Sequence, residues 1–160
     1  MIETTLVFPL RPDQVCLGYK TSGFGVGKWN GFGGKIEAEE SPSGNAVREL
    51  REETGIRANE VDLRWVAEHT FYQGGGAGVD IHMYVYTLIC TKAEPREVEK
   101  MRPEWFAFDA IPYGEMWVDD ILWLPRVLSG ERLRGEFWFD EAGERIRGHT
   151  LKPLELRDFE

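Results

Sequence analysis

The chain has 160 residues and a mass of 18.4 kDa, a length that suits one domain spanning residues 1–160 with its own core. Apolar residues make up 42% of it and six residues are tryptophan, so the composition excludes a disordered protein. Nineteen basic against 28 acidic residues give a net charge of −9, which argues against a nucleic-acid polymer or an anionic membrane as a partner. An anionic substrate would need a cation, such as a bound metal, to offset this charge.

The N-terminal segment and the two cysteines indicate an intracellular chain. The first residues, MIETTLVFPL, contain Glu3 and no Lys or Arg, which is not the pattern of a secretory signal, and no stretch reaches the ~20 apolar residues of a membrane span. Cys16 and Cys90 lack the spacing of a metal or redox motif, so we expect both to be buried in strands. We therefore expect the protein to be cytoplasmic.

Strands and helices are expected along the whole chain. Two strands, 5–10 and 14–20, flank the turn Arg11-Pro12-Asp13, and the glycine-rich segment 23–34 has the composition of a loop. The further strand candidates are 64–72, 79–90, 104–108, and the hairpin 133–139 with 145–151. A helix is expected at 119–128, although Pro125 would bend it or restrict its start. Helices flanked by strands predict a mixed α/β domain.

A second helix, 42–54, has both of its ends marked. Ser41 is a good N-cap, Pro42 occupies the first helical position, and Gly55 suits the left-handed residue that ends a helix. At ~100° per residue one arc of this helix faces the core. The residues on that arc are Ala46, Val47, Leu50 and Thr54.

Three glutamates crowd another arc of the same helix. Glu49, Glu52 and Glu53 are neighbours on the helix surface, and the last two lie near its C-terminus, where the helix dipole disfavours anions. A divalent cation such as Mg²⁺ would make this crowding favourable, because it binds carboxylate oxygens. The alternative is a solvated face on which Arg48 pairs with Glu52. The preceding glycine-rich loop favours the metal, although it matches neither the P-loop nor the dinucleotide pattern.

Residues 34–56, GKIEAEESPSGNAVRELREETGI, resemble the Nudix box, Gly-x5-Glu-x7-Arg-Glu-U-x-Glu-Glu-x-Gly-U, in which U is aliphatic. The positions that fit are Gly34, Glu40, Arg48, Glu49, Leu50, Glu52, Glu53, Gly55 and Ile56. The resemblance implies a Nudix fold, an α/β/α sandwich with a mixed β-sheet. It also implies Mg²⁺-dependent hydrolysis of a nucleoside diphosphate linked to another moiety, with Mn²⁺ as a possible substitute.

The likeness extends beyond the box. The stretches GFGVGKWNGFGGKIE (23–37) and MRPEWFAFDAIPYGEMWVDDILWLP (101–125) are similar to the animal Nudix enzymes that hydrolyse oxidised purine nucleoside triphosphates. By position, the resemblance implies a catalytic group of Arg48, Glu49, Glu52 and Glu53, and a metal site of Gly33, Gly34, Glu49, Glu52 and Glu53. The chain departs from these enzymes where an acidic residue would precede Met101, because Lys100 stands there with Glu99 beside it.

The same resemblance implies a nucleotide pocket. The residues matching base-reading positions are Asn30, Trp117, Asp119 and Asp120, and those matching other pocket positions are Thr5, Lys20, Phe24, Phe32, Gly33, Gly34, Lys35 and Phe71. Two adjacent carboxyls in a confined site raise one pKa, so Asp119 and Asp120 can offer a donor and an acceptor together. The alternative is that Asp119 caps the following helix and Trp117 is part of the core.

The sequence therefore predicts a monomeric enzyme of nucleotide-pool sanitation that acts on a small-molecule nucleotide. It would convert substrates such as 8-oxo-dGTP or 2-oxo-dATP to monophosphate and pyrophosphate by attack at the β-phosphorus. Two other functions stay open: a Nudix enzyme acting on ADP-ribose or a dinucleoside polyphosphate, and a nucleotide-binding regulator without turnover.

Overall fold

One mixed sheet organises the computed structural model, which describes residues 1–74 and 78–155. Its strands are β1 (Ile2–Arg11), β2 (Gln14–Lys20), β3 (Trp29–Asn30), β4 (Arg64–Tyr72), β5 (Ile81–Ile89), β6 (Met101–Ala107), β7 (Leu133–Phe139) and β8 (Ile146–Pro153). The α-helices are α1 (Pro42–Thr54) and α2 (Asp120–Leu128). Short 3₁₀ turns occur at Glu60–Asp62, Phe108–Ala110 and Tyr113–Glu115.

The strand order is β3-β2-β1-β5-β4-β7-β8, and β6 pairs with β2 outside this path. β1 runs parallel to β5, and β4 runs parallel to β7. The pairs β1–β2, β2–β3, β2–β6, β4–β5 and β7–β8 are antiparallel. The mixed sheet expected for the Nudix fold is thus confirmed.

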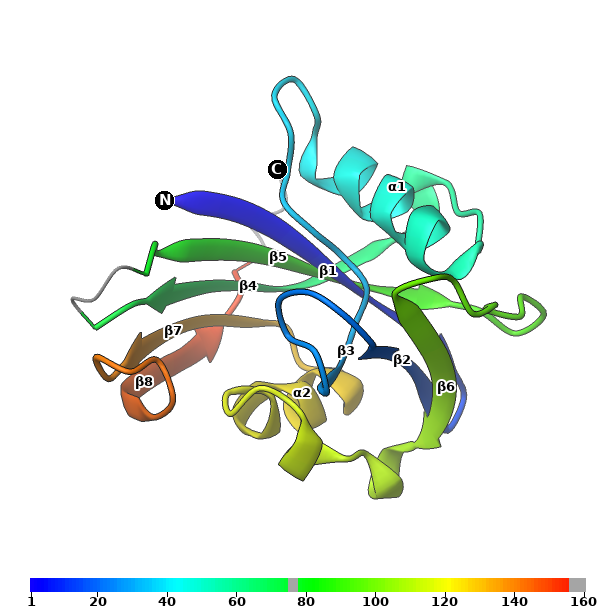
Figure 1. The fold of residues 1–160 in the computed structure, drawn as a ribbon. Helices are drawn as coiled ribbons and strands as arrows, with labels where there is room; N and C mark the ends of the chain where they lie inside the picture. The colour runs from blue at the N-terminus through cyan, green and yellow to red at the C-terminus, as the bar shows by residue number, and fades with distance from the viewer. Residues whose placement is uncertain (75–77, 156–160) are drawn as a thin grey trace.

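A helix packs against each face of the sheet at β1. In Figure 1, α1 lies on one side of the sheet and α2 on the other. Leu6 and Phe8 of β1 join a cluster with Trp123 of α2, whereas Val7, between them, joins a cluster with Leu50 of α1. Successive side chains of a strand point to opposite faces, so a run of apolar residues supplies both cores. Full burial of each such side chain contributes about 1.5–3 kcal/mol.

α1 begins and ends where the sequence predicts. Ser41 Oγ accepts a hydrogen bond from the Gly44 N–H at 3.0 Å, and Gly55 has a left-handed backbone with φ of 77°. Its buried side differs from the predicted arc, however, because Asn45 is fully buried and Val47 is only half-buried. Asn45 is buried because its side chain forms hydrogen bonds with the Thr5 hydroxyl and the Lys35 carbonyl beneath the helix.

Two expected elements have different bounds in the structure. The predicted loop 23–34 contains β3, in which Trp29 and Asn30 pair with β2. The predicted strand 104–108 begins earlier, at Met101, although Pro103 lies inside it. Pro103 lacks an N–H, which a strand tolerates when it pairs on one side only, and β6 pairs with β2 alone among the named strands.

Both cysteines are buried free thiols, as expected, although Cys90 directly follows β5 and does not lie within it. Within residues 1–74 and 78–155, no helix has the length and apolar character needed to cross a membrane.

Candidate active site

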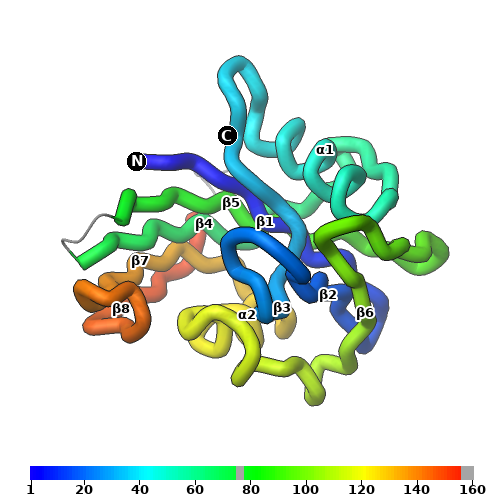
Figure 2. Tube along the Cα trace, viewed as in Figure 1, coloured from blue at the N-terminus to red at the C-terminus, as the bar shows by residue number. Residues whose placement is uncertain are grey.

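A cavity of about 640 Å³ opens beside the sheet and is walled by segments from many parts of the chain. In Figure 2 the segment between β2 and β3 (blue) lies close to the segment that leads into α2 (yellow). The ring of Phe24 in the first segment stacks on the ring of Trp117 in the second, with 5.3 Å between centroids. The rest of the wall comes from β1, β2, β4, β5, β6 and β7, from β3 with the loop that follows it, from Glu53 of α1, and from the β7–β8 turn.

The structure brings most of the predicted pocket residues to this cavity. Those that line it are Thr5, Lys20, Phe24, Asn30, Gly33, Gly34, Lys35, Phe71, Trp117, Asp119 and Asp120. Phe32 does not line it. Its side chain is fully buried in the core cluster under α1, and its backbone N–H and C=O both bond to Val7. Phe32 therefore supports the cavity wall from behind.

Glu53 is the box glutamate that lines the cavity. Its Oε1 accepts a hydrogen bond from the backbone N–H of Gly33 at 2.8 Å. A Cβ at Gly33 would lie 1.8 Å from the carbonyl oxygen of Thr5, so only glycine allows the loop to approach β1 this closely. Burial, together with the charge of Glu49, raises the pKa of Glu53 to about 8, although the Gly33 bond and Lys20 act against the rise.

Glu49 lies beside the same loop. A Cβ at Gly34 would be 2.6 Å from Glu49 Oε1, which shows how closely this carboxyl contacts the backbone of the loop. Burial raises the pKa of Glu49, and the charges of Glu52 and Glu40 raise it further, while the charge of Arg48 lowers it. Two carboxyls that both resist ionisation therefore face one glycine-rich turn.

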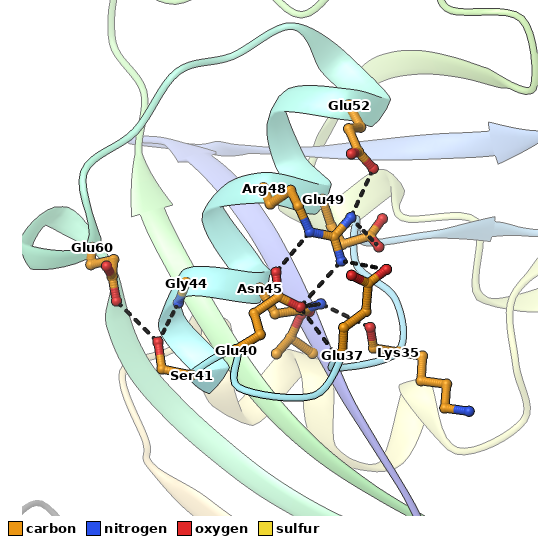
Figure 3. A network of polar contacts seen from close by, with 11 residues as sticks. Lys35, Glu37, Glu40, Ser41, Gly44, Asn45, Arg48, Glu49, Glu52 and Glu60 are labelled. Carbon is orange, nitrogen blue, oxygen red and sulfur yellow. Dashed lines mark hydrogen bonds and ion pairs between the residues drawn. The ribbon is translucent and has the colours of Figure 1, made fainter.

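Arg48 is the centre of the polar network shown in Figure 3. Its Nε donates to Glu40 Oε2 at 2.7 Å, and its Nη1 lies 3.1 Å from Glu52 Oε2 and 3.3 Å from Glu49 Oε1. The hydrogen bond from Arg48 lowers the pKa of Glu40 to about 2. The Arg48–Glu52 pair of the solvated-face alternative is therefore present, but the same guanidinium also anchors Glu40.

Glu40 ties this network to the cavity through Asn45. The Asn45 amide donates to Glu40 Oε1 at 2.8 Å and to the Lys35 carbonyl at 2.9 Å, while its oxygen accepts the Thr5 hydroxyl. Arg48, Glu40 and Asn45 thus connect the helix, the loop and β1. Asn45 was not among the predicted residues, because a buried asparagine on a helix has no pattern of its own in the sequence.

The carboxylates of Glu49, Glu52 and Glu53 are the kind of ligand that a hard divalent cation prefers, but their side chains are not arranged around one point. Burial raises the pKa of both Glu53 and Glu49, and the charge of Glu49 raises that of Glu53 further. A bound cation would reverse these effects. Within the described residues, however, no three His, Cys, Asp or Glu side chains converge on one point, since Glu52 turns toward Arg48. Glu53 and Glu49 would hold the metal, and Glu52 would join them by leaving Arg48.

Glu99 and Lys100, which precede Met101, contact Thr21 through their backbone carbonyls. Both Glu99 and Lys100 are exposed, and neither lines the cavity. The Thr21 N–H donates to the Lys100 carbonyl at 3.2 Å, and the Thr21 hydroxyl donates to the Glu99 carbonyl at 3.4 Å. The structure therefore assigns no carboxylate from this segment to the site, and Met101 is its contribution to the cavity wall.

Asp119 and Asp120 also line the cavity, and both are almost completely buried. Asp119 Oδ2 accepts the indole N–H of Trp123 at 2.8 Å, and burial raises the pKa of Asp119 to about 6. Burial and the charge of Asp119 raise the pKa of Asp120 well above its usual range. Asp120 Oδ2 has no hydrogen-bond partner among the described residues, which leaves it available to a ligand.

The structure fits less well with the alternative in which Asp119 caps the helix and Trp117 is a core residue. Asp119 occupies the N-cap position of α2, but its side chain makes no capping hydrogen bond. Trp117 is half-buried and lines the cavity, so it is not a plain core residue. Asn30 completes the group: its Oδ1 accepts the Gly31 N–H at 2.8 Å, which leaves the amide N–H groups as donors.

The cavity is also lined by residues that the sequence analysis did not indicate. They are Thr4, Leu6, Gly18, Gly25, Lys28, Gly31, Gln73, Ile81, Met83, Met101, Phe139, Ala142 and Gly143. Most lie on strands that the topology brings together from distant parts of the chain. Lys28, two residues before Asn30, could have been found from its place in the glycine-rich segment.

The comparison with protein families settles the relationship of the chain. The model of the NUDIX domain matches residues 3–127. The chain belongs to the Nudix family. Two relatives of this Nudix protein are the proteins named oxidized purine nucleoside triphosphate hydrolase from Danio rerio and Mus musculus. They are 40% and 36% identical to it over 152 and 151 residues, which cover 94% of this chain and 94% of each relative.

Solved structures agree on the fold. A MutT protein from Bacillus halodurans superposes on this Nudix protein with a TM-score of 0.80 at 22% identity, covering 97% of this chain and 100% of the other. At that identity the likeness supports the α/β/α architecture alone.

Proposed function

We propose that this Nudix protein hydrolyses oxidised purine nucleoside triphosphates to the monophosphate and pyrophosphate, and so clears damaged nucleotides from the pool. The observation that carries the proposal is the buried Asp119–Asp120 pair in the same cavity as Glu53, with one carboxyl oxygen that has no partner among the residues the structure describes. One end of the cavity offers a reader for a base, and the other offers carboxylates for a metal–polyphosphate. The names of the two curated relatives support the same substrate class.

The phosphate end combines acidic and basic groups. A bound Mg²⁺ would neutralise the phosphates and polarise the phosphorus under attack. Lys20 lies near Glu53 and lines the cavity, so its ammonium can bind phosphate oxygens. Burial raises the pKa of Glu53 to about 8, so the free carboxyl is mostly protonated at neutral pH. In its ionised form, which a bound cation would favour, Glu53 can accept a proton from an attacking water. Arg48 keeps Glu40 and the helix in place without lining the cavity.

The base end can read more than one oxidised purine. Asp119 is held by Trp123 as an acceptor, while the raised pKa of Asp120 favours its protonated form, which donates. Asn30 adds amide donors, and Trp117 adds an aromatic face for stacking. Because a proton can move between the two carboxyls, the pair can match bases with different donor and acceptor patterns.

The proposal includes Mg²⁺ as the metal, with Mn²⁺ as a substitute, and a monomer that works in the cytoplasm as one domain. Carboxylate ligands favour hard cations, which supports this choice of metal. The substrate is a small nucleotide, and the net charge of −9 argues against a nucleic-acid polymer or a membrane as a partner.

The test is a comparison of kcat/KM with Mg²⁺ for 8-oxo-dGTP, 2-oxo-dATP, dGTP and ADP-ribose. We expect the two oxidised triphosphates to be preferred and pyrophosphate to be released. Preference for ADP-ribose would assign a different Nudix activity. Tight binding without turnover of any nucleotide would show a regulator and would overturn the proposal.

Variants of the aspartate pair test the reading of the base. Asp119→Asn and Asp120→Asn remove the exchangeable proton and keep the size of the side chain, so each should change the 8-oxo-dGTP to 2-oxo-dATP ratio of kcat/KM by at least about tenfold. Asp109→Asn, at an exposed aspartate outside the cavity, is the matched control. An unchanged ratio in both cavity variants would contradict proton exchange.

A further inference from the structure

The cavity has two chemically different ends, which allows its lysines to be told apart. The stem of Lys20 lies beside Gly25, 4.0 Å from where a Cβ would lie there, while its charge acts on Glu53 and lowers the pKa of that carboxyl, which assigns its ammonium to the phosphate end. The base end contains Asp119, Asp120 and Trp117. A nucleotide bound along the cavity would place its phosphates near the first group and its base near the second.

Lys28 also lines the cavity, and its ammonium lies beside Trp117. Its Nζ is 5.2 Å from the centroid of the Trp117 ring, within the range of a cation–π contact. The neighbouring Gly25 approaches the same ring, since a Cβ there would lie 3.6 Å from Trp117 Cζ2. The segment that contains Lys28 therefore wraps around the aromatic residue that we expect to stack on the base.

The backbone of Lys28 is fixed while its ammonium is available. The Lys28 N–H donates to the Gly25 carbonyl at 3.1 Å, and the Lys28 carbonyl accepts the Lys20 N–H at 3.2 Å. In the part of the chain that the structure describes, the ammonium makes no ion pair or hydrogen bond. Its contact is the Trp117 ring, so the three N–H donors remain for a ligand.

An ammonium can only donate hydrogen bonds, which gives this position a preference among purines. Carbonyl oxygens of a base accept such a bond, whereas an exocyclic amino group presents donors and is disfavoured beside a cation. We propose that Lys28 is a specificity-determining residue that donates to a carbonyl oxygen of the base held against Trp117. This inference rests on the proposed function and adds a cationic reader to the aspartate pair.

Binding of two monophosphates to the metal-free protein tests the inference by calorimetry. 8-oxo-dGMP carries carbonyl groups on its base, whereas dAMP carries none, and the two share the same sugar and phosphate. Lys28→Met keeps the apolar stem and removes the charge. We expect it to weaken binding of 8-oxo-dGMP by at least about fivefold and that of dAMP by less than about twofold.

Three further variants make the result specific. Lys28→Arg keeps the charge and should retain the selectivity, and Lys152→Met removes one charge at an exposed position away from the cavity. Lys20→Met should weaken both monophosphates to a similar extent, because it acts on the shared phosphate. Equal losses for both monophosphates in Lys28→Met would show a phosphate contact and overturn the inference.

Two other results would also overturn it: no change in Lys28→Met, or a wild type that binds neither monophosphate. Loss of the proposed function is a separate outcome. A wild type that binds 8-oxo-dGMP with the expected dependence on Lys28, but hydrolyses no triphosphate, would refute the activity and leave the role of Lys28 standing.

Discussion

Trp123, in the first turns of α2, donates its indole N–H to Asp119 Oδ2 at 2.8 Å. Asp119 lies just before the helix, four residues earlier in the chain. Both side chains are buried, so the bond is shielded from water. The donor stabilises the ionised form of Asp119 and opposes the rise in its pKa caused by burial. The core of the protein is thereby linked to the group that we expect to read the base.

Trp123→Phe should raise the pKa of Asp119 above about 6, because it removes the donor that favours the carboxylate. The measurement is the pH dependence of kcat/KM, which reports the ionisations of the free enzyme. The smaller ring also leaves a void that lowers stability by about 1–3 kcal/mol, but a void alone leaves the midpoint of the profile in place. Trp138→Phe, at a partly exposed tryptophan, is the control.

Asp120→Asn should make the protein more stable at high pH. A carboxyl whose pKa is raised in the folded state binds its proton more tightly there than in the unfolded chain. Its contribution to stability is therefore present at low pH and is lost as the pH rises through the folded pKa. Asparagine does not ionise, so the Tm of the variant should exceed that of the wild type by several degrees at pH 9 and by much less at pH 5.

Asp109→Asn provides the comparison for that experiment, since it removes an exposed carboxyl. A Tm difference for Asp120→Asn that does not change with pH would contradict a raised pKa.

Arg48→Lys should lower kcat/KM by about tenfold to a hundredfold, because small displacements of catalytic groups have effects of that size. Lysine keeps the charge but cannot form the two contacts of Nε and Nη2 with Glu40 at 2.7 and 3.2 Å. The apparent Mg²⁺ dependence of the rate should weaken in parallel. Arg51→Lys, at an exposed arginine of the same helix, should leave both quantities unchanged.

Local chemistry explains why much of the fold could be predicted. The ends of α1 are marked by Ser41 and Gly55, whose preferences follow from hydrogen bonding and backbone conformation at those positions. The strands β4, β7 and β8 are found close to their expected ranges because apolar and polar residues alternate along them or turn residues mark their ends. The short β3 was missed because its pairing with β2 depends on tertiary contacts of glycine-rich chain.

The site residues were predicted from their positions in motifs. The prediction fails where the direction of a side chain depends on tertiary packing. Phe32 shares a motif with pocket residues, yet its ring turns into the core under α1. Asn45 looks like a variable helix position, but its amide joins the loop, Glu40 and β1. The turn of Glu52 toward Arg48 likewise depends on side-chain rotamers that spacing along a helix does not determine.

Glu53→Gln should reduce kcat by at least about a hundredfold while the protein still folds. The amide can accept the Gly33 N–H through its oxygen, so the local bond found at 2.8 Å can persist. It can neither accept a proton from water nor bind a cation as a carboxylate. Circular dichroism and Tm establish folding, and turnover near that of the wild type would contradict the assigned role.

Uptake of Mg²⁺ tests most directly whether the crowded glutamates of α1 exist to hold a cation. Titration calorimetry at pH 7, in two buffers of different ionisation enthalpy, measures binding and proton exchange together. We expect the wild type to bind Mg²⁺ and to release close to one proton, because Glu53, with a pKa of about 8, is mostly protonated beforehand. Glu53→Gln should bind the ion more weakly and release no such proton. Absence of Mg²⁺ binding to the wild type, both alone and with a monophosphate present, would contradict the metal-dependent mechanism.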